Sequence, residues 1–286
     1  QDQHTEKLNF KLHYGDLTDS TNIIRIIQEV QPDEIYNLGA MSHVKVSFDS
    51  PEYVANVDGL GTLRILEAVR ILGLEKKTRI YQASTSEMFG KVQHIPQNEK
   101  TPFYPRSPYG VAKLAAYWMS INYRESYNMF VCNGILFNHE SALRGPHYVI
   151  KKIIHQAILI SQGLQKEPIQ LGNIDIERDW GYAPHYVDAM WRILQQAHFE
   201  DYHICSGTLT SLKSFIELVL KKLNLDFEKH IVISSKLYRP VDLQSIYGDN
   251  SKAKEKLGWV YDLNADQLID QLLKDELNYM QWISEN

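Results

Sequence analysis

Cysteine, long apolar runs and excess charge are all scarce in this sequence. Only Cys132 and Cys205 occur in 286 residues, each in an apolar run typical of a strand. Two widely separated cysteines do not suggest a disulfide scaffold, and no Cys/His group has metal-ligand spacing. No apolar run approaches the ~20 residues that cross a bilayer, and a net charge of −5 offers nucleic acid no overall positive field. We expect a reducing, cytoplasmic setting, without membrane or nucleic-acid partners.

A glycine-rich phosphate loop is also absent. The chain opens with QDQHTEKLNF, which has no initiator Met and leads directly into a strand-like segment. A dinucleotide-binding fold begins with a strand and a glycine-rich turn whose backbone N–H groups reach the pyrophosphate. Gly59 and Gly61 fall inside a helical segment and do not suit that task. We expect the first βα unit to precede residue 1; the alternative is a chain that does not bind a dinucleotide in the usual way.

What the sequence does contain is an alternation of strand and helix patterns. Residues 10–14 have the period of two expected of a strand, and residues 21–30 carry an apolar helical face after Asp19 or Ser20 as N-cap. Further strands are expected over 33–40, 78–84 and 129–136. Helices are expected over 50–74, with Pro51 at its first position, and over 107–128. Repeated strand–turn–helix units predict right-handed crossovers and a parallel sheet.

The fold class is therefore α/β, with a doubly wound, Rossmann-like parallel sheet that lacks its first βα unit here. After residue 145 the pattern loosens into helices and short strands, which predicts a smaller C-terminal α/β lobe. We expect residues 1–145 to form the dinucleotide-binding domain. Residues 146–286 are expected to form mainly the substrate lobe, with some segments returning to the first domain.

Polar residues follow several of the predicted strands. The stretches GDL, NLGAMSH, ASTSEMFG and FNHES all stand where a strand ends. Ligands of parallel sheets bind beyond the carboxyl ends of the strands, so these residues are expected to meet at one site. The alternative, that they are only polar turns, leaves unexplained why Asn, Ser, Thr, Glu and His gather at one edge.

Tyr109 and Lys113 are the first candidate catalytic pair. They are four residues apart in SPYGVAK and so share a helical face. A free tyrosine is a poor base at neutral pH, but a nearby ammonium favours the phenolate. Such a pair can take a proton from an alcohol while hydride leaves its carbon. The alternative is a packed Tyr109 and a solvated Lys113.

Together these stretches resemble a known family. YGDLTDS, YNLGAMSHV, YQASTSEMFG, SPYGVAK, GILFNHES and RDWG resemble the extended short-chain dehydrogenase/reductases, and within them the GDP-mannose 4,6-dehydratases. The resemblance covers about residues 10–259. It implies conversion of GDP-mannose to GDP-4-keto-6-deoxy-mannose, on the route to GDP-fucose or related deoxysugars, by an NADP-dependent hydro-lyase.

The triplet Thr85-Ser86-Glu87 distinguishes this family from its relatives. Epimerases of the superfamily usually have small or hydroxyl residues where Glu87 stands, whereas dTDP-glucose dehydratases have an Asp-Glu pair. The resemblance implies that Glu87 removes the C5 proton and protonates the departing C6 oxygen, and that Thr85 assists Tyr109 and Lys113. The alternative is that Glu87 is an acid on a solvated loop.

The resemblance also implies binding residues. Those for NADP are Asp16, Leu17, Leu38, Gly39, Ala40, Ser42, Tyr53, Lys113, His139 and Arg144. Those for GDP-mannose are Asn138, Lys152, Arg178 and Arg239, since guanidinium groups bind diphosphates in bidentate fashion. His139 could instead be a satisfied buried histidine, and each basic residue an ordinary surface charge. The residue that would distinguish NADP from NAD is expected before residue 1, and no metal site is expected.

Two rival interpretations stay open. One is another nucleotide-sugar 4,6-dehydratase or an epimerase, and the other is a cofactor-less, non-catalytic relative. The long helices expected over 50–74 and 107–128 resemble those that pair subunits in this superfamily. We therefore expect a homodimer or a homotetramer.

Overall fold

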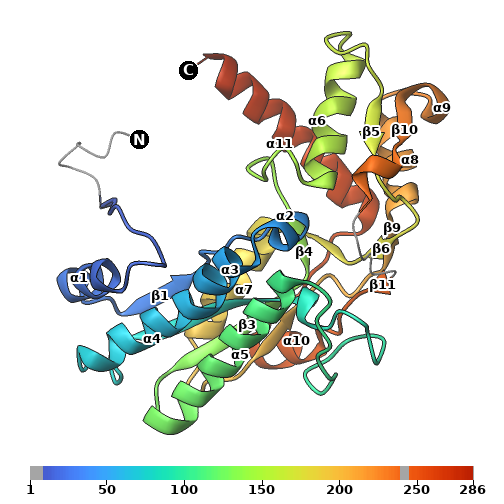
Figure 1. The fold of residues 1–286 in the computed structure, drawn as a ribbon. Helices are drawn as coiled ribbons and strands as arrows, with labels where there is room; N and C mark the ends of the chain where they lie inside the picture. The colour runs from blue at the N-terminus through green and yellow to red at the C-terminus, as the bar shows by residue number, and fades with distance from the viewer. Residues whose placement is uncertain (1–8, 239–244, 286) are drawn as a thin grey trace.

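The computed structural model describes residues 9–238 and 245–285, and a parallel sheet lies at its centre (Figure 1). This sheet contains β1 (Glu34–Asn37), β2 (Arg79–Thr85), β3 (Val131–Leu136) and β8 (Tyr202–Ile204), in the order β1-β2-β3-β8. Every pairing within it is parallel. The predicted α/β class with a parallel sheet is therefore confirmed.

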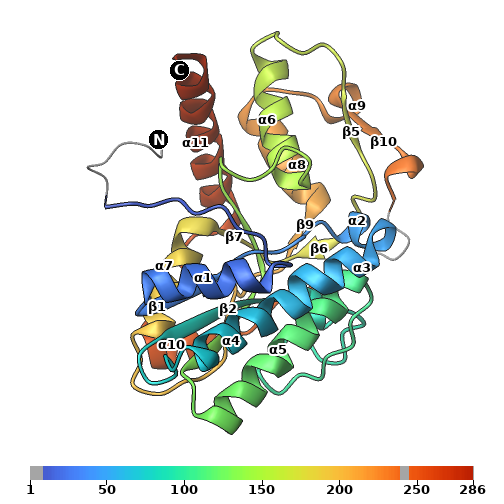
Figure 2. The ribbon, with the colours of Figure 1, turned by 60° about the vertical axis from the view of Figure 1, so that its left-hand side comes forward.

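Helices cover both faces of this sheet. α1 (Ser20–Val30), α4 (Gly61–Ile71) and α5 (Pro108–Tyr127) lie on one face, and α7 (Ala183–Leu194) and α10 (Ser251–Leu257) on the other (Figures 1 and 2). Successive strand residues serve opposite faces, so Ile80 packs with α1 and α4 while Tyr81 packs with α7. α7, β8 and α10 all follow residue 145, so later segments return to the sheet.

The helix predicted over residues 50–74 is interrupted. α2 (Val44–Asp49) precedes it, and α3 (Pro51–Val54) begins at Pro51, as expected. A π-helical turn, η1 (Ala55–Leu60), then joins α3 to α4. Such turns carry one extra residue per turn and are frequent at functional sites. Here η1 packs against α5, the helix that carries Tyr109.

The strand predicted over residues 10–14 is wrong. This segment has no regular secondary structure, and Phe10, Leu12 and Tyr14 are respectively 57%, 49% and 80% exposed. A strand needs a hydrogen-bonding neighbour, and no strand in the described part of the chain pairs with this segment.

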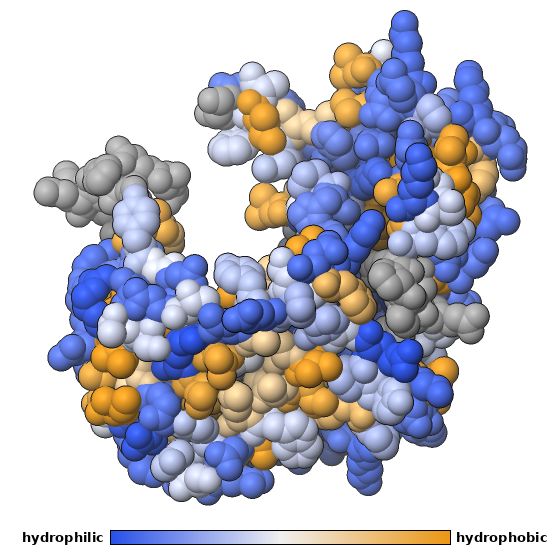
Figure 3. All heavy atoms as spheres, in the orientation of Figure 1, coloured by the Kyte–Doolittle hydropathy of each residue, from blue (hydrophilic) through white to orange (hydrophobic). Residues whose placement is uncertain are grey.

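A second hydrophobic core lies beyond the sheet. It joins α6 (Val149–Ser161), α8 (Leu212–Lys222) and α11 (Ala265–Glu285) with the paired strands β5 (Ile169–Leu171) and β10 (Ile231–Ile233). The remaining short elements are β4 (Asn138–Glu140), β6 (Glu177–Arg178), β7 (Trp180–Tyr182), β9 (Thr210–Ser211), α9 (Phe227–His230), η3 (Ser235–Leu237) and β11 (Ser245–Ile246). Figure 3 shows the surface hollowed between this second lobe and the sheet domain. The division at residue 145 stays a prediction.

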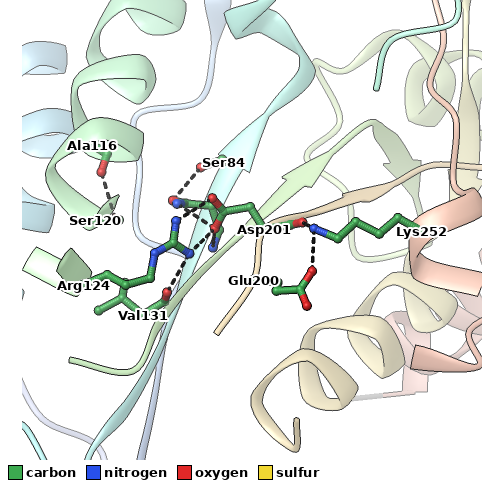
Figure 4. Close-up of polar contacts among 9 residues, drawn as sticks. Ser84, Ala116, Ser120, Arg124, Val131, Glu200, Asp201 and Lys252 are labelled. Carbon is green, nitrogen blue, oxygen red and sulfur yellow. Dashed lines mark hydrogen bonds and ion pairs between the residues drawn. The ribbon is translucent and has the colours of Figure 1, made fainter. Parts of the chain in front are cut away.

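Buried polar contacts fix α5 against the far ends of the strands. The Arg124 guanidinium donates two hydrogen bonds of 2.9 Å to the Asp201 carboxylate (Figure 4). The two side chains are only 11% and 12% exposed. Asp201 also accepts from the Asn133 backbone N–H at 2.8 Å, so one ion pair ties α5 to β3 and to the start of β8. This anchors the C-terminal part of α5, opposite to the turn that holds Tyr109.

The described residues show neither a disulfide between the two cysteines nor a helix that could cross a bilayer. Cys132 and Cys205 are both free and buried. Within residues 9–238 and 245–285, no helix combines the length and the apolar character that crossing a bilayer requires.

Candidate active site

The predicted site residues come together where the strands end. β1, β2 and β3 are parallel, so the segments that follow them, residues 38–43, 86–90 and 137–140, leave the sheet at the same edge. The first turn of α5 lies at this edge too, since α5 packs against both β2 and η2 (Ser86–Met88). The expected convergence is thus present for the three stretches that follow β1, β2 and β3 (Figure 1), whereas GDL follows no strand, since residues 10–14 form none.

Thr85 and Gly110 determine where Glu87 lies. Thr85 ends β2, and its Oγ1 accepts a hydrogen bond of 3.2 Å from the Glu87 backbone N–H, which caps the short helix η2. A Cβ atom on Gly110 would lie 2.9 Å from the Glu87 carbonyl oxygen, so a side chain there would push η2 away from α5. The absent side chain lets the half-buried Glu87 stand beside Tyr109, close enough for its charge to act on the phenol.

Tyr109 lies in the first turn of α5, which the Ser107 side chain caps by accepting from the Gly110 N–H at 3.0 Å. Tyr109 is 8% exposed. Burial raises the pKa of its phenol, a hydrogen bond with the Thr85 side chain opposes this shift, and the charges of Asp58 and Glu87 add to it. Thr85 and Tyr109 are therefore close enough to influence each other, and the assistance of Tyr109 by Thr85 in catalysis stays a prediction.

Lys113 lies one turn further along the same helix and is 3% exposed. Its Nζ donates a hydrogen bond of 3.0 Å to the Ala83 carbonyl of β2, so the alternative of a solvated lysine is wrong. Burial lowers the pKa of Lys113, and the charge of Asp58 opposes this. The expected lowering of the Tyr109 pKa by Lys113 is not seen: burial has the largest effect on the phenol, and Lys113 is not among the groups that mainly influence it.

The cofactor residues predicted after β1 form an exposed loop. Leu38 is 53% exposed, and Gly39 packs against Leu17, whose Cδ1 would lie 2.7 Å from a Cβ at position 39. Next to it, Asp16 accepts two hydrogen bonds of 2.8 Å from Thr18. Asp16, Leu17 and Gly39 are therefore neighbours, as their predicted common role requires, and Ala40 follows in the same loop.

Ser42 connects this loop to the second lobe. Its hydroxyl is 2.8 Å from the hydroxyl of Tyr148, the N-cap residue of α6. The Arg144 guanidinium stacks on the Tyr148 ring at 3.8 Å, and its Nε is 3.6 Å from the buried Glu140 carboxylate. Burial raises the pKa of Glu140 to about 7. Tyr53, another predicted cofactor residue, lies on α3 and is 50% exposed.

His139 is half-buried and already makes contacts within the protein. Its Nδ1 is 2.8 Å from the Phe137 carbonyl, and its ring stacks on Tyr186 with centroids 4.7 Å apart. Burial lowers the pKa of His139 to about 4, so the ring is neutral at physiological pH. A contact with the cofactor stays a prediction.

The predicted substrate residues lie on separate elements, Asn138 on β4, Arg178 on β6 and Lys152 on α6. Asn138 on β4 pairs with Trp180 of β7. Arg178, two residues before Trp180, is 5% exposed, and its guanidinium donates a hydrogen bond of 2.8 Å to the Glu177 carbonyl. Lys152 donates to the Gln170 carbonyl at 2.6 Å. Arg239 lies outside the described residues. Lys151, next to Lys152, is instead buried in an ion pair with Glu276.

The residues needed to hold a nicotinamide cofactor are present in part. The cofactor would find small residues after β1, the acidic Asp16 at one end and the buried amino group of Lys113 at the other. One oxygen of the buried Asp58 carboxylate has no hydrogen-bond partner. The sequence has no glycine-rich phosphate loop. Sequence reasoning missed Asp58, although an acid directly between Val57 and Gly59 is a local signal that could have indicated it.

This fold and this Thr-Glu-Tyr-Lys arrangement agree with the expected class of extended short-chain dehydrogenase/reductases, and comparison with known proteins establishes that class. A family model for GDP-mannose 4,6 dehydratase matches residues 1–272. GDP-mannose 4,6-dehydratase of Vibrio cholerae serotype O1 is 49% identical across 98% of this chain and 82% of its own length. The Homo sapiens enzyme is 48% identical across 95% of this chain and 77% of its own length.

The solved structures agree. RMD from Pseudomonas aeruginosa, complexed with NADPH, superposes with a TM-score of 0.83 at 25% identity, covering 93% of this chain and 88% of that one. The chain belongs to the GDP-mannose 4,6-dehydratase family.

Proposed function

We propose that the protein is a hydro-lyase that converts GDP-mannose to GDP-4-keto-6-deoxy-mannose with NADP as its resident cofactor. The observation that carries the proposal is the junction of Tyr109, Thr85 and Glu87 at one edge of the sheet, with Lys113 buried beneath them. Membership of the family and the NADPH complex of the similar RMD structure support the choice of substrate and cofactor.

Tyr109 acts first, as the base that takes the proton of the C4 hydroxyl. Thr85 donates a hydrogen bond that stabilises the phenolate, and the Lys113 ammonium lies on the same helical face. Bound NADP supplies the hydride acceptor at C4 and later the donor at C6. Since the pKa of Tyr109 is raised by burial, the added positive charge of the oxidised nicotinamide would favour phenolate formation.

Glu87 acts second, as the base and acid of the elimination. The 4-ketone acidifies the C5–H bond, so a carboxylate beside the sugar can remove that proton. The same group then protonates the C6 oxygen, which departs as water. Return of hydride to C6 and of a proton to C5 completes the product, with no net change in the cofactor. Glu87 is half-buried, so water can leave while the carboxylate still faces the sugar.

Asn138, Lys152, Arg178 and Arg239 are the proposed contacts of the GDP moiety. In the hollow between the lobes (Figure 3), the GDP group is proposed to lie against the second lobe and the hexose against the end of β2. The cofactor is proposed to lie along Asp16, Leu17, residues 38–42, Tyr53, Lys113, His139 and Arg144.

We also propose a homodimer or homotetramer formed through η1 and α5. A groove of about 650 Å³ lies between these elements, lined by residues such as Leu60, Tyr104 and Val111. Leu60 and Val111 are 43% and 56% exposed, and Figure 3 shows apolar atoms over this face. An apolar face of this kind suits a second copy of the chain. The two buried, free thiols support a reducing, cytoplasmic setting.

The test offers GDP-mannose and dTDP-glucose in parallel, with added NADP, and follows the alkali-developed absorbance of a 4-keto sugar. We expect turnover of GDP-mannose only. Turnover of dTDP-glucose alone would identify another 4,6-dehydratase. No turnover, with no NADP found in the purified protein by mass spectrometry, would favour a non-catalytic relative.

A further inference from the structure

Asp58 is a buried carboxylate to which the mechanism above gives no task. It lies on η1 and is 1% exposed. Its Oδ1 accepts a hydrogen bond of 2.7 Å from the Met41 N–H, whereas its Oδ2 is buried without a hydrogen-bond partner. A buried carboxylate is unfavourable unless an opposite charge compensates it.

The α5 backbone next to Lys113 lies close to Asp58: a Cβ on Gly59, the residue after Asp58, would be 3.5 Å from the carbonyl oxygen of Ala112. The opposite charge available there is that of Lys113. This lysine is 3% exposed, and the Ala83 carbonyl, at 3.0 Å, accepts one of the three protons of its ammonium group. Burial alone would favour a neutral amine, and Asp58 is the charged group that opposes this. Each of the two buried groups therefore favours the ionised form of the other.

We propose that Asp58 is a positioning residue of the reaction, the counter-ion that keeps the Lys113 ammonium charged beneath Tyr109. This inference rests on the function proposed above. The hydrogen bond from Met41 fixes the carboxylate from the loop after β1, and η1 fixes its backbone against α5. Asp58 thus connects the proposed cofactor loop to the catalytic helix.

The surrounding groups determine what loss of this charge would do. The charge of Asp58 acts on Tyr109 and Lys113 of α5, and Glu87 of η2 and Tyr148 at the start of α6 also act on the Tyr109 phenol. Asp58 raises the pKa of Tyr109 and opposes the lowering of the pKa of Lys113. Its neutralisation should therefore lower both pKa values.

The first test is the pH dependence of kcat/KM in Asp58→Asn. Asparagine keeps the shape and an acceptor for the Met41 N–H but removes the charge. We expect both limbs of the bell-shaped profile to move to lower pH together, by roughly one unit. A lower plateau with both limbs in their original positions would reduce Asp58 to a structural residue and overturn the proposal.

The second test needs no substrate. Urea unfolding is measured for Asp58→Asn, for Lys113→Met and for the double variant. Lys113→Met should lower the urea midpoint of unfolding, and we expect this decrease to be smaller when residue 58 is already Asn. If Asp58→Asn alone does not fold, adding Lys113→Met should restore folding. Additive midpoints, or no restoration, would contradict the pairing. A protein that does not turn over GDP-mannose would fail the proposed function but leave this test intact.

Asp201→Asn is the matched control. Asp201 also pairs with a basic residue of α5, Arg124, but at the other end of that helix. This variant should lose stability and keep both limbs of its pH profile. An equal displacement of the limbs in Asp201→Asn would show a general effect of lost charge and overturn the proposal.

Discussion

At the scale of single residues, the site is a group of polar side chains whose protonation is controlled by burial. Thr85, Glu87 and Tyr109 meet at the end of β2, and Lys113 lies under them against the Ala83 carbonyl. Burial raises the pKa of the Tyr109 phenol and lowers that of the Lys113 ammonium, so both neutral forms are favoured. Ionisation of this pair therefore depends on charges brought close to it, and Asp58 is one of them.

Glu87→Gln separates the two halves of the proposed chemistry. The amide cannot remove the C5 proton, so dehydration should fall by about 10²- to 10⁴-fold, while C4 oxidation persists. Stopped-flow absorbance should therefore show reduced nicotinamide accumulating without 4-keto-6-deoxy product. Tyr109→Phe should give neither signal. Glu125→Gln, on the exposed face of α5, serves as control. Normal product formation by Glu87→Gln would remove Glu87 from the mechanism.

Glu140 should make stability depend on pH. Burial raises its pKa from 4.5 to about 7, so between these values the folded protein holds a proton that the unfolded chain releases. Stability is therefore lost as pH rises through this window. Glu140→Gln should remove this loss. Relative to the unchanged protein, the free energy of unfolding of the variant should therefore be at most roughly 3 kcal/mol more favourable at about pH 8 than at about pH 5. Urea unfolding at both pH values measures it, and an unchanged pH slope would contradict the assignment.

At the scale of elements, parallel strands and the first turn of one helix place these residues together. The alternation of strand and helix patterns is enough to predict the parallel sheet, the strand ends and the shared face of Tyr109 and Lys113. It fails for residues 10–14, because a period of two does not provide a neighbouring strand. It also misses the π-turn at Asp58, since an apolar helical pattern does not reveal where the hydrogen-bond register shifts.

Contacts between segments far apart in the chain are a second reason why local sequence patterns do not predict every residue's environment. That Lys151 is buried against Glu276, while Lys152 bonds a backbone carbonyl, depends on how α11 and β5 pack on α6. Likewise, the net pKa of Tyr109 depends on how much solvent the whole site excludes. Neither is written in the local pattern around the residue.

The N-cap of α5 should matter for catalysis as well as for stability. Ser107→Ala removes the acceptor of the Gly110 N–H and should cost about 1 kcal/mol in the free energy of unfolding. Because Tyr109 lies in that same turn, kcat should fall as well. Ser211→Ala removes the cap of α8 at 3.4 Å and should lower stability only. Equal effects of both variants on kcat would show that the α5 cap does not position Tyr109.

At the scale of the whole molecule, two cores enclose a hollow, and an apolar face remains exposed on η1 and α5. The sheet domain is proposed to carry the cofactor and the reacting sugar, and the second lobe the GDP group. The exposed face is distinct from the hollow, so a second copy of the chain can cover it without blocking substrate.

Val111→Asp should break the proposed dimer. Its side chain is 56% exposed and lines the groove between η1 and α5, where a buried charge is unfavourable. Light scattering after size exclusion measures the protein concentration below which the oligomer dissociates into monomers. For the variant this concentration should be at least about tenfold higher than for the unchanged protein. Val260→Asp, at a site of 55% exposure away from that groove, should leave the assembly unchanged. An unaltered mass for Val111→Asp would place the interface elsewhere.

The central claim, that Tyr109 and Glu87 act in turn on one bound hexose, is tested most directly by isotope transfer. Two reactions are run: one with GDP-mannose deuterated at C4 in ordinary water, and one with unlabelled GDP-mannose in D₂O. Both products are analysed by NMR. The account predicts that the C4 deuterium appears at C6 and that one solvent deuterium appears at C5. Loss of the C4 label from the product, or a C5 position without solvent deuterium, would contradict it.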